Sequence, residues 1–130
     1  MTVKFIKLKK ISNQKGDLIK FVEINKKFFL KKISEIYLSE LNPLSKKAWK
    51  INYTCGQFFT NLNGKLTFIY KKKFTDKYKS KIIKTYNAVY IPKNTYYGFK
   101  NTSKKQKCLI LNTLEIKHKN CKFANMKYEK

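Results

Sequence analysis

The sequence predicts an all-β protein that folds as a sandwich or barrel. About ten short runs rich in Phe, Ile, Leu and Tyr are separated by polar stretches, which is the pattern of such folds. Helical spacing of apolar residues is sustained nowhere for three turns. Only four Gly and two Pro occur, so the turns are expected to depend on Asn and on Lys-rich polar segments.

The first half of the chain is predicted to supply six strands because apolar and polar residues alternate or cluster in short runs. These runs are Val3–Lys9, Asp17–Glu23, Lys27–Ile33, Ile36–Leu41, Trp49–Tyr53 and Gln57–Leu62. A turn at Thr54-Cys55-Gly56 separates the last two. Asn63-Gly64, the strongest hairpin signal in the chain, is expected to join the sixth run to the alternating segment Leu66–Tyr70.

The second half continues in the same way after a polar loop at Phe74–Ser80. Four further strands are predicted: Lys81–Thr85, Ala88–Ile91, Tyr97–Lys100 and Cys108–Leu114. The tail from Lys117 has weak periodicity, which is compatible with a short helix or an irregular end. We expect one domain over residues 1–130, with a core of about 13–118 and a tail of 119–130.

Composition excludes several classes of protein. The chain has 130 residues and is 42% hydrophobic, too apolar for a disordered chain. No apolar run reaches the roughly 20 residues that a membrane span needs, and the Lys-interrupted N-terminus indicates a first strand rather than a signal peptide. Cys55, Cys108 and Cys121 are odd in number and widely spaced, so neither a disulfide framework nor a zinc site is indicated. We expect a cytoplasmic protein.

The formal net charge of +24 suggests a nucleic-acid partner. All 31 basic residues, however, are Lys, and base recognition mostly uses the two-pronged guanidinium of Arg. Codon bias in an AT-rich genome explains the same composition. Binding of nucleic acid or another polyanion therefore stays an alternative, although it is not favoured.

Two sequence motifs indicate which all-β fold the chain adopts. The pattern Lys50-x-Asn52-x4-Gln57-x6-Gly64 and the pattern Pro92-x-Asn94-x2-Tyr97-x3-Asn101 have the spacing of the first and second cupin motifs. The scaffold positions Gly64, Pro92 and Asn101 keep the expected residues. The positions of three His and one Glu metal ligands hold Lys50, Asn52, Gln57 and Tyr97 instead. This predicts a cupin-type jelly-roll β-barrel with no metal and no other cofactor.

Residues 13–118 resemble the dTDP-4-dehydrorhamnose 3,5-epimerase superfamily and the related sugar-nucleotide 3,4-ketoisomerases. The resemblance is carried by KGDLIKF, KKAWK, LNGK and IPKNTYYGFKN. It implies a homodimer that binds a nucleotide-linked, dTDP-type keto-deoxy sugar in cell-surface polysaccharide biosynthesis. An active member would be an epimerase or ketoisomerase, which moves a proton beside a carbonyl group. A non-catalytic, degenerate cupin is the alternative.

Within this resemblance, Lys50 and Tyr97 are the candidate catalytic residues, as base and as hydroxyl donor to a keto oxygen. Lys47 stands where relatives often carry a phosphate-binding Arg. The candidate substrate-binding residues are Lys47, Trp49, Asn52, Gln57 and Asn61.

Each candidate also has a structural interpretation. Lys50 would be a solvated lysine, Tyr97 a space-filling aromatic residue and Trp49 a core residue. The three amides would form a satisfied polar cluster. His118, the only His, is expected on the surface rather than as a base.

Overall fold

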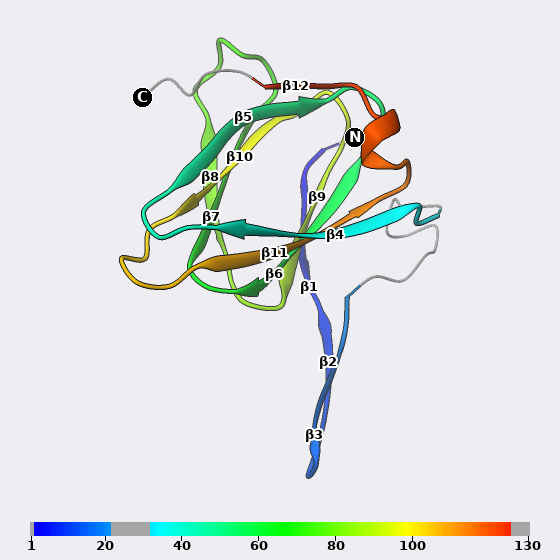
Figure 1. Cartoon of the computed structure of the whole chain (residues 1–130), viewed down its shortest axis with the longest axis vertical. Coiled ribbons are helices and arrows are strands. Elements are labelled where there is room, and N and C mark those ends of the chain that lie inside the picture. The colour runs from blue at the N-terminus through cyan, green and yellow to red at the C-terminus, as the bar shows by residue number, and fades with distance from the viewer. Residues whose placement is uncertain (1, 22–31, 126–130) are drawn as a thin grey trace.

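The computed structural model describes residues 2–21 and 32–125 and is nearly all β. Two five-stranded antiparallel sheets face each other, and a separate two-stranded hairpin extends from them (Figure 1). The first sheet has the strand order β1 (Lys4–Lys7), β9 (Asn87–Ile91), β6 (Gln57–Asn63), β11 (Cys108–Leu114) and β4 (Glu35–Leu41). The second has the order β12 (Phe123–Asn125), β5 (Lys46–Asn52), β10 (Tyr96–Asn101), β7 (Leu66–Lys71) and β8 (Lys79–Ile83).

The hydrophobic core lies between the two sheets. Inward positions on both contribute large side chains, among them Phe59, Phe68 and Phe99. Phe59 and Phe99 face each other from different sheets with ring centroids 5.0 Å apart, within the range favoured by aromatic pairs. A second, smaller cluster around Phe58 and Tyr90 covers the outer face of the first sheet. Alternate residues of β6 therefore serve two clusters, as the two-residue period of a strand requires.

The hairpin of β2 (Lys9–Asn13) and β3 (Gly16–Lys20) projects away from the body of the two sheets (Figure 1). Its inner end packs against the Phe58 cluster through Ile19. The predicted Val3–Lys9 run is thus divided between β1 and β2. The predicted strand Lys27–Ile33 falls largely outside the described residues, and its last two residues are not in a strand.

The all-β prediction is confirmed, one expectation about connectivity needs correction, and the closed barrel is not confirmed. Asn63-Gly64 does form a tight turn, with Gly64 at φ +102°. The strands that it joins, β6 and β7, belong to different sheets, so the turn carries the chain across the sandwich instead of closing a hairpin. Hydrogen bonding around a closed barrel is not seen among the described strands, because each sheet ends at two edge strands.

The C-terminal tail adds to the second sheet. A single 3-10 turn at His118–Asn120 is followed by β12, which pairs with β5 in the register Phe123↔Asn52 and Asn125↔Lys50. Sequence periodicity was too weak to indicate this strand. Along residues 2–21 and 32–125, no helix is both long enough and apolar enough to cross a membrane.

Candidate functional site

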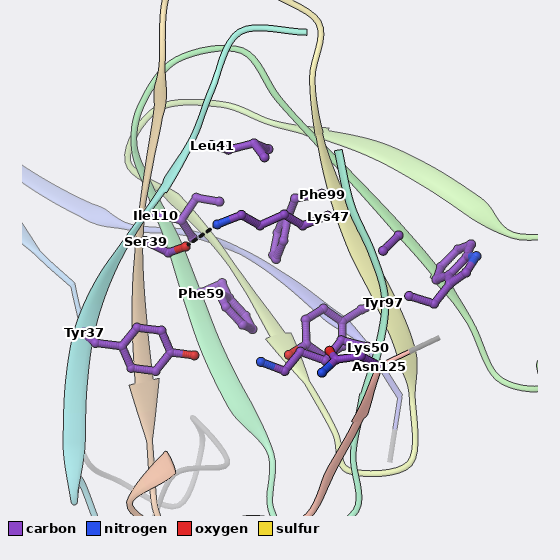
Figure 2. Close-up of a pocket in the computed structure, with 12 residues that line it drawn as sticks. Tyr37, Ser39, Leu41, Lys47, Lys50, Phe59, Tyr97, Phe99, Ile110 and Asn125 are labelled. Carbon is purple, nitrogen blue, oxygen red and sulfur yellow. Dashed lines mark hydrogen bonds between the residues drawn. The ribbon is translucent and has the colours of Figure 1, made fainter. Parts of the chain in front are cut away.

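A cavity of about 330 Å³ opens between the two sheets, at the end where β5, β10, β4 and β12 meet (Figure 2). This volume lies near the lower limit of ligand pockets in proteins, about 300 to 1,000 Å³. Its apolar lining is formed by Leu41, Ala48, Trp49, Phe59, Phe99 and Ile110. Its polar side chains are Tyr37, Ser39, Lys47, Lys50, Tyr97 and Asn125. An apolar pocket with a few convergent polar groups is the usual form of a small-molecule site.

A β-bulge in β5 brings both lysines into this pocket. Tyr97 pairs with Lys50 and Phe99 pairs with Lys47, so two residues of β5 lie opposite the single residue Gly98. Without the bulge, positions three apart on a strand would face opposite sides. The extra residue in β5 shifts the in-out alternation of its side chains by one position, as bulges do. Both lysines therefore lie on the inner side of the sheet with Tyr97 and Phe99.

Gly98 is required for this bulge. A Cβ atom at position 98 would lie 2.4 Å from the Ala48 Cβ atom and 2.7 Å from the Lys47 carbonyl oxygen. Both distances are shorter than non-bonded atoms allow. Only glycine therefore permits β10 to approach β5 this closely.

Lys50 is half-buried, and its ammonium group lies 4.3 Å from the centre of the Phe123 ring on β12. Burial lowers the pKa of Lys50, and the positive charge of Lys47 lowers it further. Both effects disfavour the protonated form. They move Lys50 in the direction that a general base requires.

Lys47 crosses the mouth of the pocket from the second sheet to the first. Its ammonium group donates to the Ser39 hydroxyl at 3.4 Å (Figure 2). It also donates to the Glu40 carbonyl oxygen at 2.9 Å. An ammonium group has three N–H donors. One donor is therefore left for a ligand, and the charge stays near the entrance.

Tyr97 is buried and forms part of the pocket wall (Figure 2). Its hydroxyl oxygen accepts a hydrogen bond from Gln57 Nε2 at 3.0 Å. Burial raises the pKa of Tyr97 well above its usual range, and the Gln57 hydrogen bond opposes this only in part. Tyr97 therefore keeps its proton at neutral pH and can act as a hydrogen-bond donor, but not as a base.

The three predicted amide residues, Asn52, Gln57 and Asn61, lie outside the pocket lining. Asn52 closes the turn before β6, because its Oδ1 atom accepts from the Thr54 and Cys55 amides at 2.8 and 3.3 Å. Asn61 holds the other end of β6, donating to the Gly64 and Ile83 carbonyl oxygens at 3.0 and 2.7 Å. Gln57 does not line the pocket, but it is hydrogen-bonded to Tyr97, which does. All three amides are buried.

Trp49 borders the cavity, but its ring packs elsewhere. The ring lies 5.6 Å from Tyr78, measured between centroids, and 4.4 Å from the Lys71 ammonium group. Neither Tyr78 nor Lys71 lines the pocket. The ring is thus already covered by the protein itself.

Sequence reasoning missed several residues that the fold places here. Tyr37 enters from β4, and Asn125 enters from β12, the strand that was not foreseen. His118 is exposed, as expected, yet its ring lies edge-on to Tyr37 at 5.7 Å and stacks on Phe123 at 4.6 Å. Tyr37, Ser39 and Leu41 alternate along β4, which could have indicated that they share its inward face. The residues between them, Ile36 and Leu38, are more apolar, so the sequence favoured the opposite face as the inward one.

The four positions that hold metal in many cupins do not fit a metal here. An amine, two amides and a phenol with a raised pKa replace the imidazole and carboxylate ligands that divalent metals favour. Among residues 2–21 and 32–125, no three His, Cys, Asp or Glu side chains are grouped closely enough to hold a metal ion.

Comparison with known proteins identifies the fold. No protein-family model matches the chain, and no curated protein matches it in sequence. Among solved structures, a dTDP sugar isomerase from Desulfovibrio desulfuricans superposes with a TM-score of 0.82 at 21% identity, over 96% of this chain and 83% of its own. The TDP-quinovose 3,4-ketoisomerase of Campylobacter jejuni gives 0.72 at 21% identity, over 92% and 90%.

A 3,5-epimerase shares the same architecture. The dTDP-6-deoxy-D-glucose-3,5-epimerase of Legionella pneumophila, solved with dTDP-4-keto-L-rhamnose, gives a TM-score of 0.77 at 13% identity, over 97% of this chain and 73% of its own. The resemblance inferred from the motifs is therefore confirmed as a shared fold. The chain has the cupin fold of these dTDP-sugar isomerases and epimerases.

Proposed function

We propose that this protein is a metal-independent cupin that binds a nucleotide-linked keto-deoxy sugar of the dTDP type. One observation carries the proposal: Lys47, Lys50 and Tyr97 converge on one apolar-walled cavity, in a fold shared with enzymes of that substrate class. The two ammonium groups suit a diphosphate, although as point charges without the two-pronged grip of Arg. The phenol suits a sugar carbonyl oxygen.

The same residues support proton transfer if the protein is an enzyme. In its neutral form, Lys50 would take a proton from the carbon beside the sugar carbonyl. Tyr97 would donate a hydrogen bond to the carbonyl oxygen and so stabilise the enolate that forms. Return of the proton to another face or position would give an epimerase or a ketoisomerase. We further propose, as the sequence resemblance implies, that this activity serves cell-surface polysaccharide biosynthesis and that the protein is a homodimer.

The test is a thermal-shift screen of the wild-type protein against dTDP, UDP, GDP and CDP. A ligand at about 100 times its dissociation constant stabilises a protein by roughly 2.7 kcal/mol. We expect one nucleotide diphosphate to raise the unfolding temperature at both low and moderate salt, and Lys47→Met with Lys50→Met to remove most of that shift. No shift with any nucleotide would refute the proposal.

A short DNA duplex in the same screen tests the polyanion alternative, which the net charge of +24 favours. Binding that neutralises many phosphates weakens steeply with salt because counterions are released. Stabilisation by DNA alone, vanishing at moderate salt, would identify the lysine-rich surface as the functional one. A site with two or three phosphate contacts would be far less sensitive.

A further inference from the structure

We propose that Tyr37 is a second hydroxyl donor to the ligand, and that buried Gln57 and Asn112 are positioning residues that direct the hydroxyl hydrogens of Tyr37 and Tyr97 into the pocket. This inference rests on the proposed function, since it names the part of the ligand that these groups recognise. Figure 2 shows Tyr37 and Tyr97 pointing toward each other from opposite walls of the cavity.

A chain of three side-chain hydrogen bonds joins the two tyrosines. Asn112 Nδ2 donates to the Tyr37 hydroxyl oxygen and, at 3.0 Å, to Gln57 Oε1. Gln57 Nε2 then donates to the Tyr97 hydroxyl oxygen at 3.0 Å. The chain runs through β4, β11, β6 and β10, so it links the two sheets behind the pocket.

The direction of these hydrogen bonds decides whether the two phenol hydrogens are available to a ligand. A phenol has one hydrogen to donate and lone pairs to accept with. Each tyrosine accepts its hydrogen bond from an amide N–H, so the chain leaves the phenol hydrogen uncommitted. Both phenols line the cavity, where a ligand oxygen can receive that hydrogen.

The amides are fixed in place by complete burial. Asn112 has an exposed fraction of 0% and Gln57 of 1%. Asn112 Oδ1 finds no hydrogen-bond partner among the described residues, an arrangement that native cores seldom tolerate. Two apolar residues at positions 57 and 112 would avoid the cost of this unsatisfied buried oxygen. We therefore infer that the two amides are present because they orient the tyrosines that line the pocket.

The arrangement specifies the ligand group. Two phenol donors lie on opposite walls, and Lys50 lies on β5, between β10 and β12. Together they present hydrogens to an oxygen-rich group. A keto sugar carries such oxygens on its ring. We therefore assign Tyr37 and Tyr97 to the sugar, while the lysine at the entrance, Lys47, is left for the diphosphate.

Binding of TDP-4-keto-6-deoxyglucose and of TDP alone, measured by calorimetry on full-length variants, tests the assignment. Tyr37→Phe and Tyr97→Phe should each weaken binding of the keto sugar on the order of tenfold, the effect of one lost hydrogen bond, and leave TDP affinity unchanged. Gln57→Met should do the same in the wild type and cost less than that in the Tyr97→Phe background, because part of its effect acts through Tyr97. Asn112→Leu should likewise cost less in the Tyr37→Phe background than in the wild type, because part of its effect acts through Tyr37.

A second readout needs no ligand. In protein labelled with ¹³C at the tyrosine ring Cζ, the Tyr97 signal is the one missing from Tyr97→Phe, and it should move in Gln57→Met. The Tyr37 signal should move in Asn112→Leu. Thermal unfolding identifies any variant that does not fold, in which case the two Tyr→Phe variants, which delete single hydroxyls, decide alone.

The outcomes separate the two levels of inference. If the wild type binds neither probe, the proposed function fails, while the NMR shifts still establish or refute the hydrogen-bond chain. If the keto sugar binds and the paired substitutions are additive, or the Tyr37 hydroxyl proves dispensable, the further inference is overturned and the proposed function stands.

Discussion

Substituting Gly98→Ala tests whether the bulge in β5 forms the site. The added Cβ atom would lie 2.4 Å from the Ala48 Cβ atom and 2.7 Å from the Lys47 carbonyl oxygen. Neither neighbour is the free end of a flexible side chain, so relief requires the two strands to separate. Overpacking of this kind costs typically about 1 to 3 kcal/mol, and we expect the upper end of that range.

This cost converts to a measurable shift in unfolding temperature. Unfolding entropy of about 2.1 cal/mol/K per residue gives roughly 0.27 kcal/mol/K for 130 residues. A loss of about 3 kcal/mol therefore lowers the midpoint by roughly 11 °C. Circular dichroism on heating measures this directly, and dTDP affinity should fall as well because Lys47 and Lys50 lose their common orientation.

Two further variants make this prediction specific. Ala48→Gly in the Gly98→Ala background removes the 2.4 Å contact and leaves the 2.7 Å contact, so it should restore part of the stability. Gly16→Ala is the control: nothing lies within 4 Å of its added Cβ atom, but its φ of +140° strains any other residue. That variant should lose stability without losing affinity.

Wild-type stability and wild-type affinity in Gly98→Ala would refute the account of the bulge. So would a double-mutant cycle in which positions 48 and 98 show no coupling, since residues in direct contact couple by about 0.5 kcal/mol or more.

Three other predictions concern scaffold and charge. Asn101→Ala should lower the free energy of unfolding by about 2 to 4 kcal/mol, because the side chain donates to the Leu41 and Gln106 carbonyl oxygens at 3.0 and 2.7 Å and accepts from the Ser103 amide at 3.0 Å. Urea titration measures this loss, and a change like that of exposed Thr102→Ala, within about 0.5 kcal/mol, would contradict it. Lys50→Met should raise stability at neutral pH, because the folded pKa of Lys50 lies below its unfolded value of 10.5 and the protonated form is therefore penalised by folding. That advantage should shrink as the pH rises through the folded pKa toward 10.5; a difference between the two proteins that does not change with pH would show that Lys50 is not perturbed. Lys47→Met should raise the pKa of Lys50, since the charge of Lys47 contributes to lowering it, and lysine side-chain NMR across an alkaline titration would show no change if the two ammonium groups do not interact.

The sequence by itself determined the fold class and the position of most strands. A short apolar run bounded by polar turn residues indicates a buried strand from local sequence alone, so β6, β9, β10 and β11 were found close to their observed bounds. Motif spacing also predicted two residues of the site. Lys50 and Tyr97 are 47 residues apart in the sequence, yet they pair across neighbouring strands and line one cavity.

Pairing between strands was decided only by the tertiary structure. The Asn63-Gly64 turn specifies a reversal of direction, but whether the two strands pair depends on which sheet buries each of them. Likewise β12 is three residues long, too short for a periodic signal, and it exists because the edge of β5 offers it backbone hydrogen bonds.

The tertiary structure also decided which polar side chains meet in the site. Sequence alternation grouped Asn52, Gln57 and Asn61 as one polar wall, yet two of them satisfy turn backbones and the third holds Tyr97. Lys47 reaches the pocket only because the bulge opposite Gly98 changes its phase, and Tyr37 because β4 lies across from β10 in the other sheet. Local sequence carries the period of a strand, whereas these contacts join segments that only packing brings together.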